Sequence, residues 1–387
     1  MKHKAKKGHS KNSGSLLSFG GVMLHLVRLI TAAVFVFSGF VKAVDPLGTV
    51  YKIQDYLTAF GGIWQGLATL AFPAAIIMIL FELLLGLCLL FQVRFRLAAV
   101  FSLLFMLVMT PLTLYIAIKN PVTDCGCFGD ALVITNWQTF IKNIFFLIFS
   151  IILVWKRKSF RPLFHKKPEW VILIVFAVGA LSFMVYNLNR LPIIDFRPYK
   201  VSVNIAEAMS IPDDAPGDVF EYNFVYEKEG ARKTFGLENL PDSSWTFVSQ
   251  ESRLIQEGYR PPINDFLILS ADYDDVTDEL IRYPGKTYIA IMYDLNKASS
   301  NGVEEVRRFH EQLKDDGTRF VAITASSHSV IKEFKDANKL HFTFYSADDI
   351  LLKTMIRSNP GLILLEDGTI SAKWHWRSIK KIYQTTK

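Results

Sequence analysis

The sequence predicts an α-helical membrane bundle followed by a water-soluble α/β portion. Its 387 residues are 51% hydrophobic with a mean hydropathy of +0.25, which is too apolar for a purely soluble protein of this size. Residues 1–168 hold 18 Lys and Arg against 5 Asp and Glu, a balance of +13, whereas the remainder holds 25 against 31, a balance of −6. This composition excludes collagen-like, disulfide-stapled and wholly disordered chains. The basic residues form no folded face with interleaved aromatics, so we expect no nucleic-acid partner.

Five apolar runs are long enough to cross a bilayer, which takes roughly 20 helical residues. Because the hydrocarbon core offers backbone groups no water, each run is predicted to be a helix. The first run is too long for a cleaved signal, and no small-residue cleavage site follows it, so we expect a retained anchor. The runs lie near residues 22–44, 67–91, 97–118, 140–155 and 170–186.

The basic residues predict the orientation of these spans. Thirteen of them lie in three alternate connecting segments, which successive spans place on one side of the bilayer: a tail at 1–21, the link between the second and third runs, and a loop at 156–169. The opposite loops carry only Lys52 and Lys119. By the positive-inside rule the tail and the 156–169 loop are cytoplasmic, and everything after a fifth span at 170–187 lies outside. The thirteen residues are Lys2, Lys4, Lys6, Lys7, Lys11, Arg94, Arg96, Lys156, Arg157, Lys158, Arg161, Lys166 and Lys167.

Residues 188–282 are predicted to be an extracytoplasmic connecting region. It contains a hairpin, in which residues 220–227 and 232–237 flank a turn at Lys228-Glu229-Gly230. An acidic run between 272 and 279 invites comparison with a calcium loop. Val276 falls where a calcium ligand is needed and no Gly follows, so a solvated face is the better interpretation and no metal site is expected. The acidic residues are Asp272, Asp274, Asp275, Asp278 and Glu279.

Residues 283–387 alternate strand and helix patterns and end in a hairpin across Asp367-Gly368. This order resembles the thioredoxin fold, and Ser358-Asn359-Pro360 before the hairpin resembles that family's cis-proline turn. The resemblance implies a cis bond at Pro360 and a substrate- or partner-binding role for Asn359 and Pro360. The stretch 294–306, where thioredoxins carry C-x-x-C, has no cysteine, so this domain cannot perform dithiol exchange by itself.

Two of the three cysteines, Cys125 and Cys127, lie in the loop between the third and fourth spans, separated only by Gly126. The predicted extracytoplasmic side is where disulfides persist. A ring closed over one glycine is strained relative to ordinary disulfide geometry, and strained, exposed disulfides exchange readily with partner thiols. The pair is therefore a candidate catalytic site. An inert crosslink, two free thiols or a metal site remain alternatives, although no further metal ligand lies nearby in the sequence. Cys88, within a span, is expected to be a buried apolar side chain.

Arg28 and Glu82 lie inside predicted spans, where charges are expensive to bury. Counted from the inner ends of their spans, the two differ in depth by only about 5 Å, so we expect a structural ion pair between them. Lys42 and Arg94 lie near span ends, where long side chains reach the interface.

The first 155 residues resemble the DoxX-like superfamily, in particular the branch of the methylamine-utilisation protein MauE. The matching pieces are Arg28, residues 37–57, Glu82 with Gly86, the run TPLTLYIAIKNPVTDCGCFGD at 110–130, and NWQTFIKN at 136–143. The resemblance implies a four-helix domain at 22–155 that assists disulfide formation in extracytoplasmic partners, with Cys125 and Cys127 as its redox pair. The whole chain resembles long bacterial members with a C-terminal thioredoxin-like domain, which implies an inner-membrane protein with that domain in the periplasm.

Two functions of different class follow from this sequence. The first is a membrane thiol-disulfide redox protein whose partners are the lipid bilayer and an extracytoplasmic thiol protein. No cofactor is evident, and a quinone as electron acceptor has no motif to support it. The second is a non-enzymatic scaffold that presents the thioredoxin-like domain while the cysteine pair stiffens a loop. The reduction potential of the pair discriminates between them, since a structural disulfide lies below roughly −300 mV.

Overall fold

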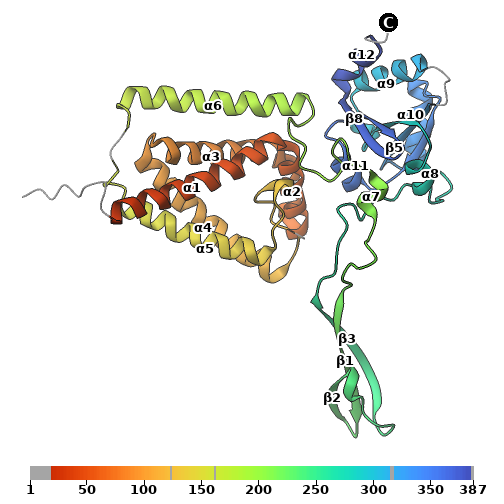
Figure 1. Cartoon of the computed structure of the whole chain (residues 1–387), viewed down its shortest axis with the longest axis horizontal. Coiled ribbons are helices and arrows are strands. Elements are labelled where there is room, and N and C mark those ends of the chain that lie inside the picture. The colour runs from red at the N-terminus through yellow and green to blue at the C-terminus, as the bar shows by residue number, and fades with distance from the viewer. Residues whose placement is uncertain (1–18, 123, 161–162, 314–317, 385–387) are drawn as a thin grey trace, which may run out of the picture. The chain divides into compact units, whose positions relative to one another are not determined.

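The computed structural model describes residues 19–122, 124–160, 163–313 and 318–384, and the chain divides into two compact units, Met1–Arg197 and Pro198–Lys387. Figure 1 traces the chain through both. Most of the predicted basic tail, residues 1–18, lies outside the described residues, as does Arg161 of the 156–169 loop.

The first unit confirms the five predicted apolar helices, each long and apolar enough to cross a membrane. Four of the five extend a few residues beyond the apolar runs, at one end or at both. Pro111 lies inside α4, and a capping box of Thr135 and Gln138 begins α5. The helices are α1 (Phe19–Val44), α3 (Ala71–Phe91), α4 (Phe95–Lys119), α5 (Asn136–Trp155) and α6 (Lys166–Asn189).

α1 and α3 run antiparallel in close contact, and two glycines permit this approach. A Cβ at Gly39 would lie 2.7 Å from the backbone nitrogen of Leu83, and a Cβ at Gly86 would lie 2.5 Å from that of Val36. Side chains would therefore force the two helices apart. α6 lies along this pair (Figure 1) and packs Met184 into the same apolar cluster.

A short helix without a span-length apolar run, α2 (Pro46–Phe60), follows α1 and was not predicted. Asp45 caps it by accepting a hydrogen bond from the Gly48 amide at 3.1 Å, and Pro46 occupies its first turn. Gly61, at φ 65°, ends it, and a 3₁₀ helix (Gly62–Leu70) leads into α3. Its 15 residues mix polar and apolar side chains, so it lacks the apolar length that marks a span.

The second unit is built on a five-stranded sheet with the order β6-β5-β4-β7-β8. β4, β5 and β6 are parallel, while β7 is antiparallel to both β4 and β8. This strand order, with helices between the parallel strands and a terminal hairpin, is a thioredoxin-like α/β fold and confirms the predicted fold class. The strands are β4 (Lys286–Ile291), β5 (Arg319–Thr324), β6 (Thr343–Ser346), β7 (Gly361–Glu366) and β8 (Thr369–His375). The helices are α9 (Ser300–Gln312), α10 (His328–Asn338), α11 (Asp349–Met355) and α12 (Trp376–Gln384).

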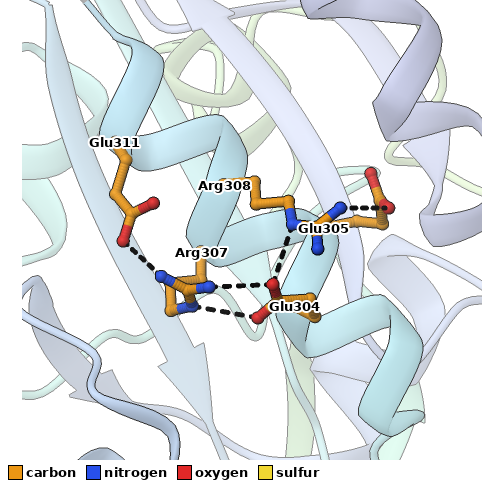
Figure 2. Close-up of polar contacts among 5 residues, drawn as sticks. All are labelled: Glu304, Glu305, Arg307, Arg308 and Glu311. Atoms are coloured by element: carbon orange, nitrogen blue, oxygen red, sulfur yellow. Dashed lines mark hydrogen bonds and ion pairs between the residues drawn. The ribbon is translucent and has the colours of Figure 1, made fainter.

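The exposed side of α9 carries a network of ion pairs at helical spacing. Arg307 donates to Glu304 at 2.8 Å and to Glu311 at 2.5 Å, and Arg308 donates to Glu304 and lies within ion-pair distance of Glu305 (Figure 2). The opposite side packs its apolar residues into the core under the sheet. Solvent screens such exposed pairs, so this network is a solvated helix face.

The segments that precede and follow a second, three-stranded sheet in the sequence extend the α/β fold. The Ser202 amide donates to the Ile370 carbonyl at 2.8 Å, and Leu269 and Ser346 exchange backbone hydrogen bonds. Parts of the predicted 188–282 connecting region, including α7 (Ile205–Met209) and α8 (Thr277–Ile281), thus lie among the segments of this unit.

The three-stranded sheet itself has the order β2-β1-β3, and its side chains are exposed or half-buried. β1 (Val219–Lys228) and β2 (Ala231–Gly236) form the predicted hairpin, with Glu229 and Gly230 both at positive φ in the turn. The third strand, β3 (Thr246–Gln256), was not anticipated.

Candidate functional site

The cysteine loop, residues 124–128, connects α4 to α5 and holds the two cysteines side by side. Both are free thiols, and their sulfur atoms lie 3.0 Å apart. Gly126 between them adopts φ 64°, a left-handed conformation that costs glycine least. Its amide donates to the Asp124 carboxylate at 2.8 Å. Cys125 is buried and Cys127 is partly exposed.

Helices α1 and α2 hold the backbone of the cysteine loop. The Tyr56 hydroxyl of α2 donates to the Cys125 carbonyl at 2.8 Å, and the Ser38 hydroxyl of α1 donates to the Cys127 carbonyl at 2.5 Å. Lys52 of α2 pairs with Asp124 at 3.0 Å. Hydrogen bonds to both cysteine carbonyls therefore fix the loop from outside its own segment.

The α5 side of the loop is also anchored. The side-chain Nδ2 of Asn136 donates to the side-chain oxygen of Asn120 at 2.7 Å and to the Val122 carbonyl at 2.9 Å, which ties the start of α5 to the end of α4. The Lys142 ammonium lies 4.2 Å from the centre of the Phe128 ring. A second cation is thereby held beside the loop.

The two thiols differ in acidity because they share a proton. A hydrogen bond from Cys125 lowers the pKa of Cys127, assisted by the positive charges of Lys142 and Lys42, and these effects outweigh burial. The same hydrogen bond, together with burial, raises the pKa of Cys125. Cys127 is therefore the more acidic thiol of the pair, and the thiolate is the form of a cysteine that attacks disulfides.

A buried ion pair lies next to the loop, but it is not the expected one. Glu82 of α3 binds Lys42 of α1, with 2.6 Å between the ammonium nitrogen and a carboxylate oxygen. Lys42 also donates to the Ser38 hydroxyl at 2.9 Å. The prediction that Lys42 merely reaches the interface is wrong, because its side chain is buried between α1 and α3.

The predicted pairing of Arg28 with Glu82 is also wrong. Arg28 donates instead to the carbonyls of Leu89 and Leu90 at 2.9 and 2.6 Å. These carbonyls belong to the last turn of α3, whose acceptors have no partner within the helix. Arg28 thus contacts α3 at Leu89, which lies seven residues, or about 10 Å along the helix axis, from Glu82.

Lys42, Ser38 and Tyr56 were missed as site residues. The signal for the first two was their spacing: polar residues four apart lie on one face of an otherwise apolar helix. Tyr56 carried no signal, because it acts from the unpredicted helix α2. Cys88 is buried in the apolar core of the bundle, as expected.

The predicted cis-proline turn is confirmed in its conformation, since the Asn359-Pro360 bond is cis. Asn359 donates to the Asp294 carbonyl at 2.7 Å and accepts from the Ser299 amide at 3.0 Å, which sets the turn against the start of α9. Its role in partner binding stays a prediction. Among the described residues, no cluster of three or more His, Cys, Asp or Glu side chains is arranged to hold a metal ion.

Comparison with known proteins separates the membrane part from the rest. Residues 21–156 match the family model of the methylamine utilisation protein MauE. The membrane part is similar to MauE. Together with the five apolar helices, this match indicates a multi-pass membrane protein. Residues 220–257, which cover β1 to β3, match a domain of unknown function, DUF8463. No curated protein matches the chain.

Two solved structures resemble part of the chain. StoA from Bacillus subtilis is 18% identical over 32% of this chain and 96% of its own, with a TM-score of 0.25. A putative protein disulfide isomerase from Bacteroides thetaiotaomicron is 13% identical over 32% of this chain and 83% of its own, with a TM-score of 0.24.

Proposed function

We propose that this chain is an integral membrane thiol-disulfide redox protein in which Cys125 and Cys127 exchange with thiols of extracytoplasmic proteins. The observation that carries the proposal is the cysteine loop itself: two sulfurs 3.0 Å apart, with both cysteine carbonyls hydrogen-bonded from neighbouring helices. Such fixation keeps the sulfurs together in both redox states, which favours rapid formation and opening of a disulfide. The similarity of residues 21–156 to MauE supports the same assignment.

In the proposed reaction the oxidised pair accepts two electrons from a partner. A partner thiolate attacks one sulfur of the Cys125–Cys127 disulfide, forms a mixed disulfide and releases the other cysteine as a thiolate. The second partner thiol, once deprotonated, attacks the partner sulfur of the mixed disulfide. The partner leaves with a disulfide, both cysteines are reduced, and the two partner thiol protons pass to the cysteines or to solvent.

We further propose that the cysteine loop faces the periplasm of a bacterium from the inner membrane. The concentration of Lys and Arg in alternate connecting segments supports this orientation. Repeated turnover requires a two-electron acceptor, for which we propose a membrane quinone. Asn359 and Pro360 would then contribute to partner binding by the thioredoxin-like domain.

A non-enzymatic scaffold is the second candidate function. It is favoured by the stretch 294–306, which lacks cysteine where the thioredoxin fold carries its dithiol. In that case the α/β unit binds a partner without exchanging electrons, and the cysteine pair only stiffens the loop.

Trapping of mixed disulfides tests the proposed function. The full-length Cys125→Ser and Cys127→Ser variants each leave one loop cysteine. In the reverse of the proposed exchange, its thiolate attacks the disulfide of an oxidised partner, releases one partner sulfur as a thiolate, and forms a mixed disulfide that no second cysteine of the pair resolves. We expect disulfide-linked adducts, sensitive to reductant, from at least one variant in intact membranes. Cys88→Ser is the matched control and should give none. Absence of adducts from both loop variants, or labelling of residue 125 only from the cytoplasmic side, would contradict the proposal.

A further inference from the structure

We infer that Lys42 is a positioning residue for the cysteine pair, and that its ammonium ion, held by Glu82 and Ser38, makes the Cys125–Cys127 disulfide a stronger oxidant. The inference rests on the proposed function and concerns the same site. Lys42 acts through the Ser38 hydroxyl and through its charge. It makes no covalent contribution to the exchange.

The first step of the argument is an unbroken chain of hydrogen bonds. It runs from the Glu82 carboxylate to the Lys42 ammonium at 2.6 Å, on to the Ser38 hydroxyl at 2.9 Å, and from there to the Cys127 carbonyl at 2.5 Å. Lys42 and Glu82 are both buried, with side-chain exposures of 9% and 6%. A charge in the helix bundle is thus connected to the cysteine loop through a single hydroxyl.

The orientation of Ser38 is the second step. A serine inside a helix commonly donates to a carbonyl of its own preceding turn. Thr31 does so in the same helix, donating to the Val27 carbonyl at 2.8 Å. Ser38 instead donates across to Cys127, while its oxygen accepts from Lys42. The ammonium strengthens Ser38 as a donor, because the two hydrogen bonds polarise one another.

The third step concerns the cost of burying this ion pair. Desolvation of two buried charges commonly cancels most of their attraction, so a buried pair is weak evidence for stability. The close approach that buries it depends on Gly39 and Gly86, each within about one helical turn of a charged partner. The bundle thus brings α1 and α3 together where the pair adjoins the cysteine loop, which is what a tuning role requires.

The electrostatic effect has the required sign. A thiolate on Cys127 gains from the positive charge of Lys42 more than it loses from the carboxylate of Glu82. Stabilisation of the thiolate stabilises the reduced pair relative to the disulfide, as in strongly oxidising dithiols. Removal of the Lys42 charge should therefore make the disulfide harder to reduce.

The test is a thiol-buffer titration of the full-length protein in membranes. Lys42→Met removes the charge, and the Lys42→Met/Glu82→Gln double variant removes it without leaving a carboxylate unpaired. We expect Lys42→Met to shift the equilibrium constant with the buffer about tenfold toward the disulfide, which corresponds to about 30 mV. The double variant should shift it in the same direction by a smaller factor, because it also removes the opposing charge of Glu82. Lys42→Arg retains the charge and should restore most of the wild-type value. Ser38→Ala should shift the constant in the same direction by a smaller factor.

A second readout is the rate at which an alkylating agent modifies chemically reduced Cys127 as pH rises. Without the Lys42 charge, the curve should move to higher pH. The variants do not alter the other charged or titratable groups around the cysteine loop. These groups are Lys52 and Tyr56 of α2, Asp124 and Cys125 of the loop, and Lys142 of α5.

The outcomes separate this inference from the proposed function. A folded double variant with the wild-type equilibrium constant and alkylation curve would overturn the role of Lys42 while the redox function stands. A wild-type pair that stays oxidised in every buffer would overturn the redox function. The alkylation curves of the chemically reduced protein would then still decide whether Lys42 acts on Cys127.

Discussion

The buried pair of Lys42 and Glu82 makes a quantitative prediction about the stability of the bundle. At 2.6 Å and an effective dielectric constant of about 20, the two charges attract each other by about 6 kcal/mol. Desolvation of the two ions offsets most of this attraction, so the net contribution is small. Removal of one partner leaves the other buried and unpaired. We therefore expect Lys42→Met or Glu82→Gln alone to lower the free energy of unfolding, by about 3–5 kcal/mol where a full charge is stranded.

The double variant Lys42→Met/Glu82→Gln leaves no unpaired charge and should unfold within about 1–2 kcal/mol of the wild type. Denaturant unfolding of the four proteins in detergent micelles gives the double-mutant cycle, and we expect a coupling energy above about 2 kcal/mol. Lys52→Met, which breaks a half-exposed pair with Asp124, is a control that should cost at most about 1 kcal/mol. Additive losses in the cycle would refute the reasoning, because they would mean that the two residues do not share an interaction.

Three further predictions concern the packing and the cysteines. Arg28→Met removes two hydrogen bonds to the last turn of α3 and should destabilise the bundle by about 1–3 kcal/mol in the same unfolding assay; an unchanged midpoint would contradict the capping role. Gly86→Ala places a methyl group against the α1 backbone and should destabilise by about 1–3 kcal/mol, whereas Gly179→Ala, where a Cβ meets nothing within 4 Å, should not; equal effects would refute the close approach. In the reduced protein an alkylating agent should modify Cys127 before Cys125, and it should do so at pH values below the usual thiol pKa of about 8.5. The rate at Cys127 should fall only when the pH drops through the lowered pKa of that thiol. Equal rates at both cysteines, measured by mass spectrometry, would contradict the assignment of Cys127 as the more acidic thiol.

The sequence predicts the parts of this fold that depend on local pattern. Apolar runs of span length become helices because a membrane helix satisfies its own backbone. The hairpin at 219–236 follows from a turn whose two central residues take positive φ. The order of strands and helices after residue 283 follows from the spacing of apolar residues along the sequence, which differs between a strand and a helix. The helix α2 and the strand β3 lack such local signals, because α2 is shorter than a span and no turn as clear as that of the hairpin marks β3.

The candidate site could be predicted only as far as the cysteines and the buried charges. The partner of Glu82 depends on how α1 and α3 are aligned, and that alignment is set by contacts at Gly39 and Gly86. The depth of a residue, counted from the end of its own span, does not reveal how α1 and α3 are aligned. The predicted pairing of Arg28 with Glu82 is wrong for this reason. Hydrogen bonds to the loop from Ser38 and Tyr56 likewise join segments more than 60 residues apart in the sequence.

The measurement that tests the central claim most directly is the reduction midpoint of Cys125 and Cys127 in intact membranes. Differential alkylation across a series of thiol buffers determines it for the full-length protein. A redox protein requires a midpoint between about −120 and −270 mV, the range of proteins that exchange disulfides with partners. A pair that stays oxidised below about −300 mV would be a structural crosslink and would contradict the account.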